Sequence, residues 1–195
     1  MNAYPDEVWV KLLISLSRYI DSQVSCSGRH SAQVADWVKT LARKFEMSEK
    51  EINGIYWASL LHDIGKLGVP VDVLSKEGPL NEHEWSLMKL HPTIGANIVK
   101  MLKTIEHVAP FIHYHQEKYD GSGYPDGLRG DDIPLGARIL AVADAYEAMT
   151  SDRYYAKART HEEAIQELKR LEGQHFDPSV VEAFVEIVTP IECYK

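Results

Sequence analysis

The chain has 195 residues, 45% of them hydrophobic, and a formal net charge of −8 at pH 7, which suits one compact globular domain with at most an added terminal helix. The negative charge argues against a protein that grips long nucleic acid by neutralising phosphates, but not against one that binds a small anion through local cations or metal ions. No run of about 18 apolar residues and no basic leader are present, so we expect a cytoplasmic protein with no membrane partner.

Helical periodicity and helix caps recur along the chain, whereas strand signals are nearly absent. Residues 6 to 22 predict a first helix, whose apolar face could either pack on the domain or pair with a second copy of the chain. A second helix is expected to start near His30. Ser48 and Glu51 predict a capping box for the third helix, with Gly65 as its C-terminal stop.

The second half of the chain continues the helical pattern around one long loop. Residues 71 to 80 are predicted to connect two helices. Residues 117 to 134 are rich in glycine and proline, and a loop of this length is usually functional or disordered. Further helices are expected at residues 81 to 90, from His91-Pro92, at 104 to 116, at 136 to 150, from Thr160 and from Asp177. In total we expect one all-α domain of about eight helices.

Histidines and carboxylates interrupt apolar stretches at several helix ends. The clearest case is LLHDIGKLGVP at residues 60 to 70, where His62 and Asp63 stand side by side. An ionised carboxylate is costly to bury unless a partner offsets it. Asp144 poses the same problem, because it is expected to be well buried inside the apolar stretch ARILAVADAYEAMTS. The candidate ligands are His30, His62, Asp63, His91, His115 and Asp144.

Imidazole and carboxylate ligands together favour iron, manganese, nickel or zinc. The two oxygens of Asp63 could bridge two such ions about 3.5–4 Å apart, a geometry that activates water and stabilises an attacked phosphate. The alternative is a scattered set of buried polar residues, each satisfied by its own partner. Spacing alone leaves both interpretations open.

At these residues the sequence resembles the HD-GYP domain, a branch of the HD phosphohydrolase superfamily, over residues 28 to 188. The motifs are HSAQVA at 30 to 35, LLHDIGKLGVP at 60 to 70, HPTIGA at 91 to 96, the GYP stretch at 119 to 153 and HFDPSVVEAF at 175 to 184. The resemblance implies a single HD-type helical bundle with a GYP loop, an N-terminal helix at 1 to 27 and a tail at 189 to 195. It also implies a metal-dependent phosphodiesterase that hydrolyses cyclic di-GMP to pGpG, GMP or both.

The resemblance also assigns roles to individual residues. His30, His62, Asp63 and Asp144 would hold a first metal ion, and Asp63 would bridge to a second ion held by His91, His115 and Gln116. Iron or manganese is expected, with nickel or zinc also open. Asp63 and Lys66 would be the catalytic residues, with Lys66 facing a phosphate oxygen. The substrate would contact Lys66, Gly123, Tyr124, Pro125 and Arg153.

Several residues depart from the pattern of this family. Gln116 stands where many members have a second histidine, so the second ion is expected to bind loosely or to have its ligand set completed by water. Cys26 stands where members with three metals have a glutamate, so the sequence predicts two ions. Ala156 removes a basic residue of the phosphate site, and Glu147 replaces a more common aspartate.

These departures keep other functions open. One is a weakly active or inactive module that binds a cyclic dinucleotide and docks on a signalling partner. Another is a phosphodiesterase for the mixed guanine–adenine cyclic dinucleotide. A homodimer formed through the N-terminal helix is also open.

Overall fold

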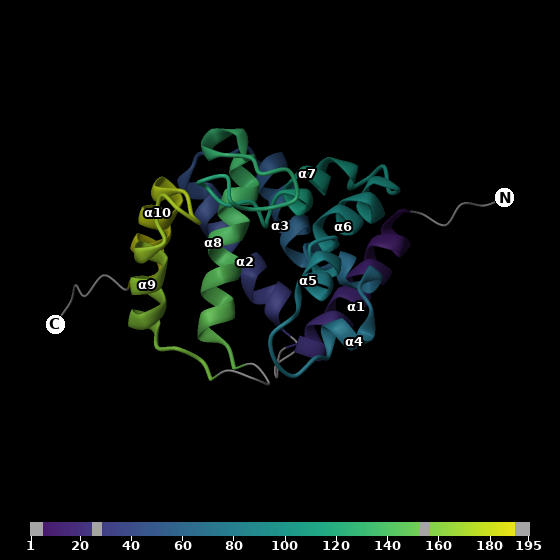
Figure 1. Cartoon of the computed structure of the whole chain (residues 1–195). Helices are drawn as coiled ribbons and strands as arrows, with labels where there is room; N and C mark the ends of the chain where they lie inside the picture. The colour runs from purple at the N-terminus through teal and green to yellow at the C-terminus, as the bar shows by residue number, and fades with distance from the viewer. Residues whose placement is uncertain (1–5, 25–28, 153–156, 190–195) are drawn as a thin grey trace.

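The structure, a computed structural model, describes residues 6–24, 29–152 and 157–189. Within these ranges the chain folds into a bundle of α-helices and short 3₁₀-helices without a β-strand, which confirms the all-α prediction (Figure 1). The α-helices are α1 Asp6–Val24, α2 His30–Lys44, α3 Glu49–Leu61, α4 Val71–Leu74, α5 Glu82–Met88, α6 His91–Lys100, α7 Ala109–His113, α8 Leu135–Thr150, α9 His161–Arg170 and α10 Pro178–Val188. The 3₁₀-helices are η1 Ile64–Gly68, η2 Glu106–Val108 and η3 Gly130–Asp132.

Helix starts follow the local capping signals of the sequence. The predicted capping boxes are present at the starts of α3, α5 and α9, and Asp177 caps α10 ahead of Pro178. Such caps each stabilise a helix by about 0.5–2 kcal/mol, because they satisfy backbone N–H groups that have no partner inside the helix. The expected number of helices also holds, since α4 and α7 are single turns of 4 and 5 residues.

The core lies where α2, α3 and α8 pack together. Val34, Val38 and Leu41 of α2 are fully buried, as are Ile55 of α3 and Leu140 of α8. α2 begins with His30, α8 contains Asp144, and His62 follows α3 directly, so the packing that forms the core brings these candidate ligands into one place. None of the helices in the described ranges combines the length and hydrophobicity needed to cross a bilayer.

The first helix, α1, packs on the domain, which confirms one of its two predicted roles. It lies against η1, α3 and α2, with Val10 and Ile20 buried. The opposite face leaves Trp9, Leu12 and Tyr19 exposed, and its pairing with a second copy stays a prediction. The buried side also carries Asp21, which is only 1% exposed.

Asp21 caps the neighbouring helix α2. Its carboxylate accepts a hydrogen bond from the backbone N–H of Ser31 at 3.0 Å and another from the Ser31 hydroxyl at 2.9 Å. Arg29, at the N-cap position of α2, provides no side-chain cap, so the cap comes from a different helix. α1 therefore fixes the first turn of α2, which begins with His30.

Three sequence predictions need correction. Gly65 does not end α3: the helix ends at Leu61, and Gly65 lies inside η1. A Cβ at Gly65 would lie 1.9 Å from the His91 carbonyl oxygen, so glycine is needed there for η1 to touch α6. Residues 71 to 80 include the short helix α4 and are not only a loop.

The helix predicted over residues 104 to 116 is also wrong in extent. The structure has the single turn η2 followed by α7, which ends at His113. Pro110 lies in the first turn of α7, where its missing N–H costs nothing, and so marks a new helix start. Tyr114 then leaves helical geometry at φ −104° and ψ 7°, which frees His115 from the helix.

Candidate metal centre

The six predicted ligands meet at one place, although they come from five different segments. Most of them stand at helix ends, where the chain turns and a side chain can point inward. His30 begins α2, His62 and Asp63 join α3 to η1, His91 begins α6, His115 follows α7, and Asp144 lies within α8. The scattered arrangement considered as the alternative is therefore wrong for these residues, since their donor atoms fall into two groups within 4.8 Å.

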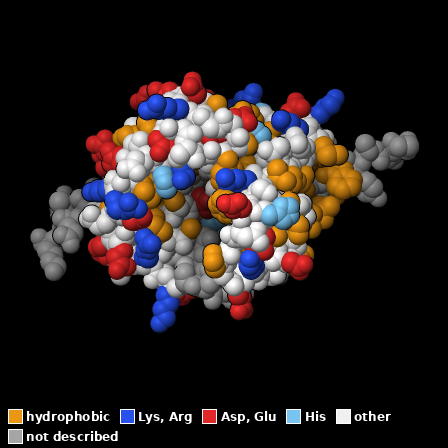
Figure 2. Space-filling view, viewed as in Figure 1, with side chains coloured by type: hydrophobic (Ala, Val, Ile, Leu, Met, Phe, Trp, Pro, Cys, Tyr) orange, Lys and Arg blue, Asp and Glu red, His pale blue; other side chains and the backbone are white. Residues whose placement is uncertain are grey.

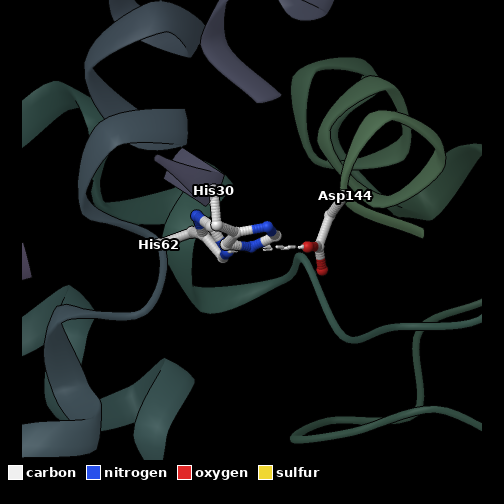
Figure 3. A group of neighbouring side chains, drawn as sticks. All are labelled: His30, His62 and Asp144. Carbon is white, nitrogen blue, oxygen red and sulfur yellow. Dashed lines mark hydrogen bonds and ion pairs between the residues drawn. The ribbon is translucent and has the colours of Figure 1, made fainter. Parts of the chain in front are cut away.

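The first cluster consists of His30, His62 and Asp144 (Figure 3). Asp144 Oδ1 lies 3.1 Å from His30 Nε2 and 3.7 Å from His62 Nε2, and the two Nε2 atoms lie 3.4 Å apart. Asp144 is less buried than expected, with 21% of its side chain exposed. Its carboxylate therefore faces both the histidines and the solvent.

The second cluster consists of Asp63, His91 and His115. His91 Nε2 lies 3.6 Å from Asp63 Oδ1 and 3.3 Å from His115 Nε2. The other oxygen of Asp63, Oδ2, lies 3.5 Å from His62 Nε2 in the first cluster. The two oxygens of Asp63 thus face different clusters, which is the arrangement that a bridging carboxylate requires.

Three of the histidines are oriented in the way that metal ligands require. In His62, His91 and His115, Nδ1 donates a hydrogen bond to the backbone carbonyl three residues earlier, at 2.8, 2.8 and 2.7 Å respectively. This bond fixes the tautomer, so the unprotonated Nε2 points into the cluster. The donor set and its outer hydrogen bonds therefore fit divalent transition metals.

His30 is held by a carboxylate instead of a carbonyl. Its Nδ1 contacts Glu147 Oε2, and the second oxygen of Glu147 accepts a hydrogen bond from the Ser151 hydroxyl at 2.6 Å. Glu147 is buried. Sequence reasoning noted Glu147 only as a departure from the family and missed this role. The available signal was its spacing, because residues 144 and 147 share one face of α8.

The charges of the two clusters differ. Burial lowers the pKa of His91 to about 4 and that of His115 to about 3, so both are neutral and can bind a metal ion. Burial also lowers the pKa of His30, but hydrogen bonds to Asp144 and Glu147 outweigh it and raise this pKa to about 10. In the absence of a metal ion His30 is therefore a cation between two carboxylates.

Asp63 remains ionised although it is buried. Burial raises its pKa, but the positive charge of nearby Lys66 leads the opposing effects, which hold the pKa well below its usual range. The Lys66 ammonium lies 2.6 Å from Asp63 Oδ2. The structure therefore places both predicted catalytic residues in contact, with a cation already beside the second cluster.

The GYP loop lies next to the second cluster. The Tyr124 ring centroid is 6.5 Å from that of His91, and the Tyr124–Pro125 peptide bond is cis. A Cβ at Gly123 would lie 2.2 Å from the Lys118 nitrogen, so only glycine allows this close approach of two backbone segments. The loop therefore places Gly123 at a close contact between two backbone segments and Tyr124 against the candidate ligand His91.

Glu117 anchors this loop and was not identified from the sequence. It is only 4% exposed, and its Oε1 accepts hydrogen bonds from the backbone N–H groups of Asp126 at 2.7 Å and Gly127 at 3.0 Å. The sequence shows only a glutamate at the start of a loop rich in glycine and proline. The backbone N–H groups that its side chain binds lie nine and ten residues further along the chain. Local patterns could not identify them.

Gln116 makes a contact that the sequence did not suggest. Its Oε1 accepts a hydrogen bond from the Tyr124 hydroxyl at 3.1 Å, and its role as a metal ligand stays a prediction. His113 belongs to neither cluster, and its Nε2 lies 3.7 Å from Asp126 Oδ2. The predictions for Arg153, Cys26 and Ala156 fall outside the described residues.

Comparisons with known proteins place the chain in a family. A family model described as HD domain matches residues 15–180. The chain is 38% identical over 180 residues to a cyclic di-GMP phosphodiesterase of Thermotoga maritima, with 91% of this chain and 48% of that protein covered. It is 35% identical over 181 residues to 3'3'-cGAMP-specific phosphodiesterase 2 of Vibrio cholerae serotype O1, with 90% of this chain and 34% of that protein covered. The chain thus spans between a third and a half of these relatives.

Solved structures show the same fold. A cyclic GMP-AMP specific phosphodiesterase of V. cholerae matches with a TM-score of 0.73 at 24% identity, covering 93% of this chain and 49% of that one. An HDG"Y"P protein from Bdellovibrio bacteriovorus matches with a TM-score of 0.65 at 24% identity, covering 82% of this chain and 51% of that one. The family model covers most of the chain, and the GYP loop lies beside the second ligand cluster. The chain therefore belongs to the HD domain family, and its GYP motif resembles that of the HD-GYP branch.

Proposed function

We propose that this chain is a metal-dependent phosphodiesterase that hydrolyses cyclic di-GMP to pGpG, GMP or both. The observation that carries the proposal is the position of Asp63, whose two oxygens face two separate groups of histidines. The names of the relatives in Thermotoga maritima and Vibrio cholerae support a cyclic dinucleotide as the substrate class. A cytoplasmic location fits a substrate of this kind.

The two clusters would each hold one divalent ion, iron or manganese, with nickel or zinc also compatible. His30, His62 and Asp144 would hold the first ion, His91 and His115 the second, and Asp63 would bridge them. Bound ions would supply Lewis-acid stabilisation of a phosphate and a water of lowered pKa.

The remaining residues would bind and orient the substrate. Lys66 lies beside Asp63, where its ammonium can pair with a phosphate oxygen of the substrate. The GYP loop would close one side of the pocket, with Tyr124 offering an aromatic face and Gly123 a close backbone approach. Arg153 would add a further cation for a phosphate or base.

The test is turnover of cyclic di-GMP by protein loaded with manganese or ferrous iron under anaerobic conditions. We expect hydrolysis that stops on treatment with a chelator and returns when the metal is restored. Asp63→Asn should lower kcat by at least about 100-fold, because one bridging charge is lost. Well-folded, metal-loaded protein that yields no linear product from cyclic di-GMP would contradict the proposal.

A binding or regulatory module is the second candidate, and the contact of Gln116 with Tyr124 favours it. An amide engaged in a hydrogen bond is a weak ligand, so the second cluster has three strong donors only. Calorimetry separates the two functions, because a module would bind the nucleotide without forming product. Parallel assays with the mixed guanine–adenine cyclic dinucleotide would settle the substrate. The homodimer and signalling partners stay predictions.

A further inference from the structure

Helix α5 is firmly anchored but buries none of its residues. Its capping box joins Asn81 and Glu84. The Glu84 carboxylate also forms an ion pair with the Lys76 ammonium at 2.5 Å. Trp85, in the middle of the helix, remains 45% exposed. A short helix in a globular domain normally buries an apolar face. Exposed apolar side chains that lie together in one patch often mark a ligand site.

Aromatic rings form a continuous line from the second cluster to α5. The ring centroids of His115 and His91 are 5.2 Å apart, those of His91 and Tyr124 6.5 Å, and those of Tyr124 and Trp85 6.4 Å. The rings of Tyr124 and Trp85 meet at an interplanar angle of 74°. Trp85 therefore lies two ring contacts beyond the ligand His91. Figure 2 shows a hollow in this face of the molecule, between the positions of α8 and α5 in Figure 1.

A cation accompanies the two aromatic rings. Lys89 Nζ lies 5.6 Å from the Tyr124 ring centroid and 6.0 Å from that of Trp85. Lys89 is exposed, and within the described part of the chain it forms no ion pair. It precedes the ligand His91 by only two residues, so the turn between α5 and α6 sets the positions of both.

We propose that Trp85, Tyr124 and Lys89 form a subsite for the half of a cyclic dinucleotide that does not lie at the metal centre. This inference rests on the proposed function. A cyclic dinucleotide is a ring of two riboses and two phosphates with a purine on each ribose, so when one phosphate reaches the clusters, a purine and the other phosphate lie nearby. Trp85 and Tyr124 hold the purine, because aromatic faces stack on any base. Lys89 pairs with the second phosphate.

The first experiment measures steady-state kinetics with cyclic di-GMP and with p-nitrophenyl methyl phosphate, a diester that lacks a purine. Trp85→Ala should raise KM for cyclic di-GMP by about 10- to 100-fold, the size expected for one lost stacking contact. Turnover of the small diester should not change. Trp85→Phe should restore most of the affinity because it keeps an aromatic face. Trp9→Ala is the matched control, since Trp9 is 46% exposed but lies on α1.

Lys89 is tested in the same assay. Lys89→Gln should raise KM for cyclic di-GMP and make it less sensitive to salt, because one charge pair with the substrate is lost. Lys103→Gln, another exposed lysine, is the control. The small diester has no second phosphate, so its turnover should stay the same in both variants.

A binding measurement without turnover separates this inference from the proposed function. Metal-loaded Asp63→Asn protein is titrated with cyclic di-GMP, and tryptophan fluorescence is recorded. Quenching should disappear in Asp63→Asn/Trp85→Phe and persist in Asp63→Asn/Trp9→Phe. If quenching is lost when Trp85 is replaced, but the unmodified chain does not hydrolyse cyclic di-GMP, the subsite is supported and the proposed enzymatic function is overturned. If the chain hydrolyses cyclic di-GMP and Trp85→Ala leaves KM unchanged, the subsite alone is overturned. If the chain shows no binding and no hydrolysis, both proposals are overturned.

Discussion

At the scale of single residues, the structure separates the ligands from the residues that orient them. Three histidines obtain their orientation from a carbonyl within the same turn, so the local helix geometry positions them. His30 obtains its orientation from Glu147, which is 117 residues away in the sequence. Outer contacts of this kind matter for affinity as well as geometry, because they fix the nitrogen that faces the ion.

Glu147→Gln should weaken metal binding at the first cluster by about 10- to 100-fold, because the amide no longer stabilises His30 in one orientation. The measurement is the metal content per chain after dialysis against a series of chelator concentrations. Glu186→Gln is the matched control, since Glu186 pairs with Lys44 on the surface. Equal metal retention by both variants would show that Glu147 does not position His30.

At the scale of elements, the sequence predicted what depends on neighbours in the chain. Ser48 with Glu51, and Asn81 with Glu84, identify helix starts because both partners lie within one turn. The end of α3 was misplaced, because Gly65 serves a contact with α6 that only the folded chain contains. The grouping of the candidate ligands likewise came from the family resemblance, since spacing alone could not choose between a metal site and separate polar residues.

Gly65→Ala should destabilise the protein by about 1–3 kcal/mol, because the added methyl group would meet backbone atoms of His91 that cannot move aside. It should also lower metal retention at the second cluster by displacing His91. Thermal unfolding of the metal-free protein and metal analysis give the two readouts.

Gly54→Ala is the comparison, since its Cβ would only reach ordinary contact at 3.4 Å from His107 and Phe111. That change should be neutral or slightly stabilising. A stable Gly65→Ala protein would contradict this reading.

At the scale of the whole molecule, α1 packs on the elements that position the candidate metal centre. It packs against α2, which begins with His30, against α3, which His62 follows, and against η1, which contains Lys66. The sequence set the domain boundary at residue 28, because the family motifs begin near His30. The hydrogen bond between Asp21 and Ser31 crosses that boundary, and none of the family motifs predicts this contact. The N-terminal helix, which lies outside the range of the motifs, therefore packs on the same core.

Asp21→Ala should lower the free energy of unfolding by about 0.5–2 kcal/mol, the usual cost of losing a helix cap. Asp21→Asn should recover part of this loss, because an amide oxygen can still accept the hydrogen bond from the Ser31 N–H. Chemical denaturation of the metal-free protein measures both. Asp36→Ala, a change at an exposed position in the middle of α2, should cost less. Equal stability of Asp21→Ala and the unmodified chain would mean that another group caps α2.

The cap from Asp21 also bears on how this protein should be shortened. A fragment cut where the recognisable motifs begin would retain every histidine and aspartate of the two clusters. It would nevertheless start with an unprotected helical turn, and that turn contains His30. Fraying there would release one ligand of the first ion while leaving the second cluster intact. Such a fragment should therefore bind the first ion more weakly than the full chain does, while its affinity for the second ion stays the same.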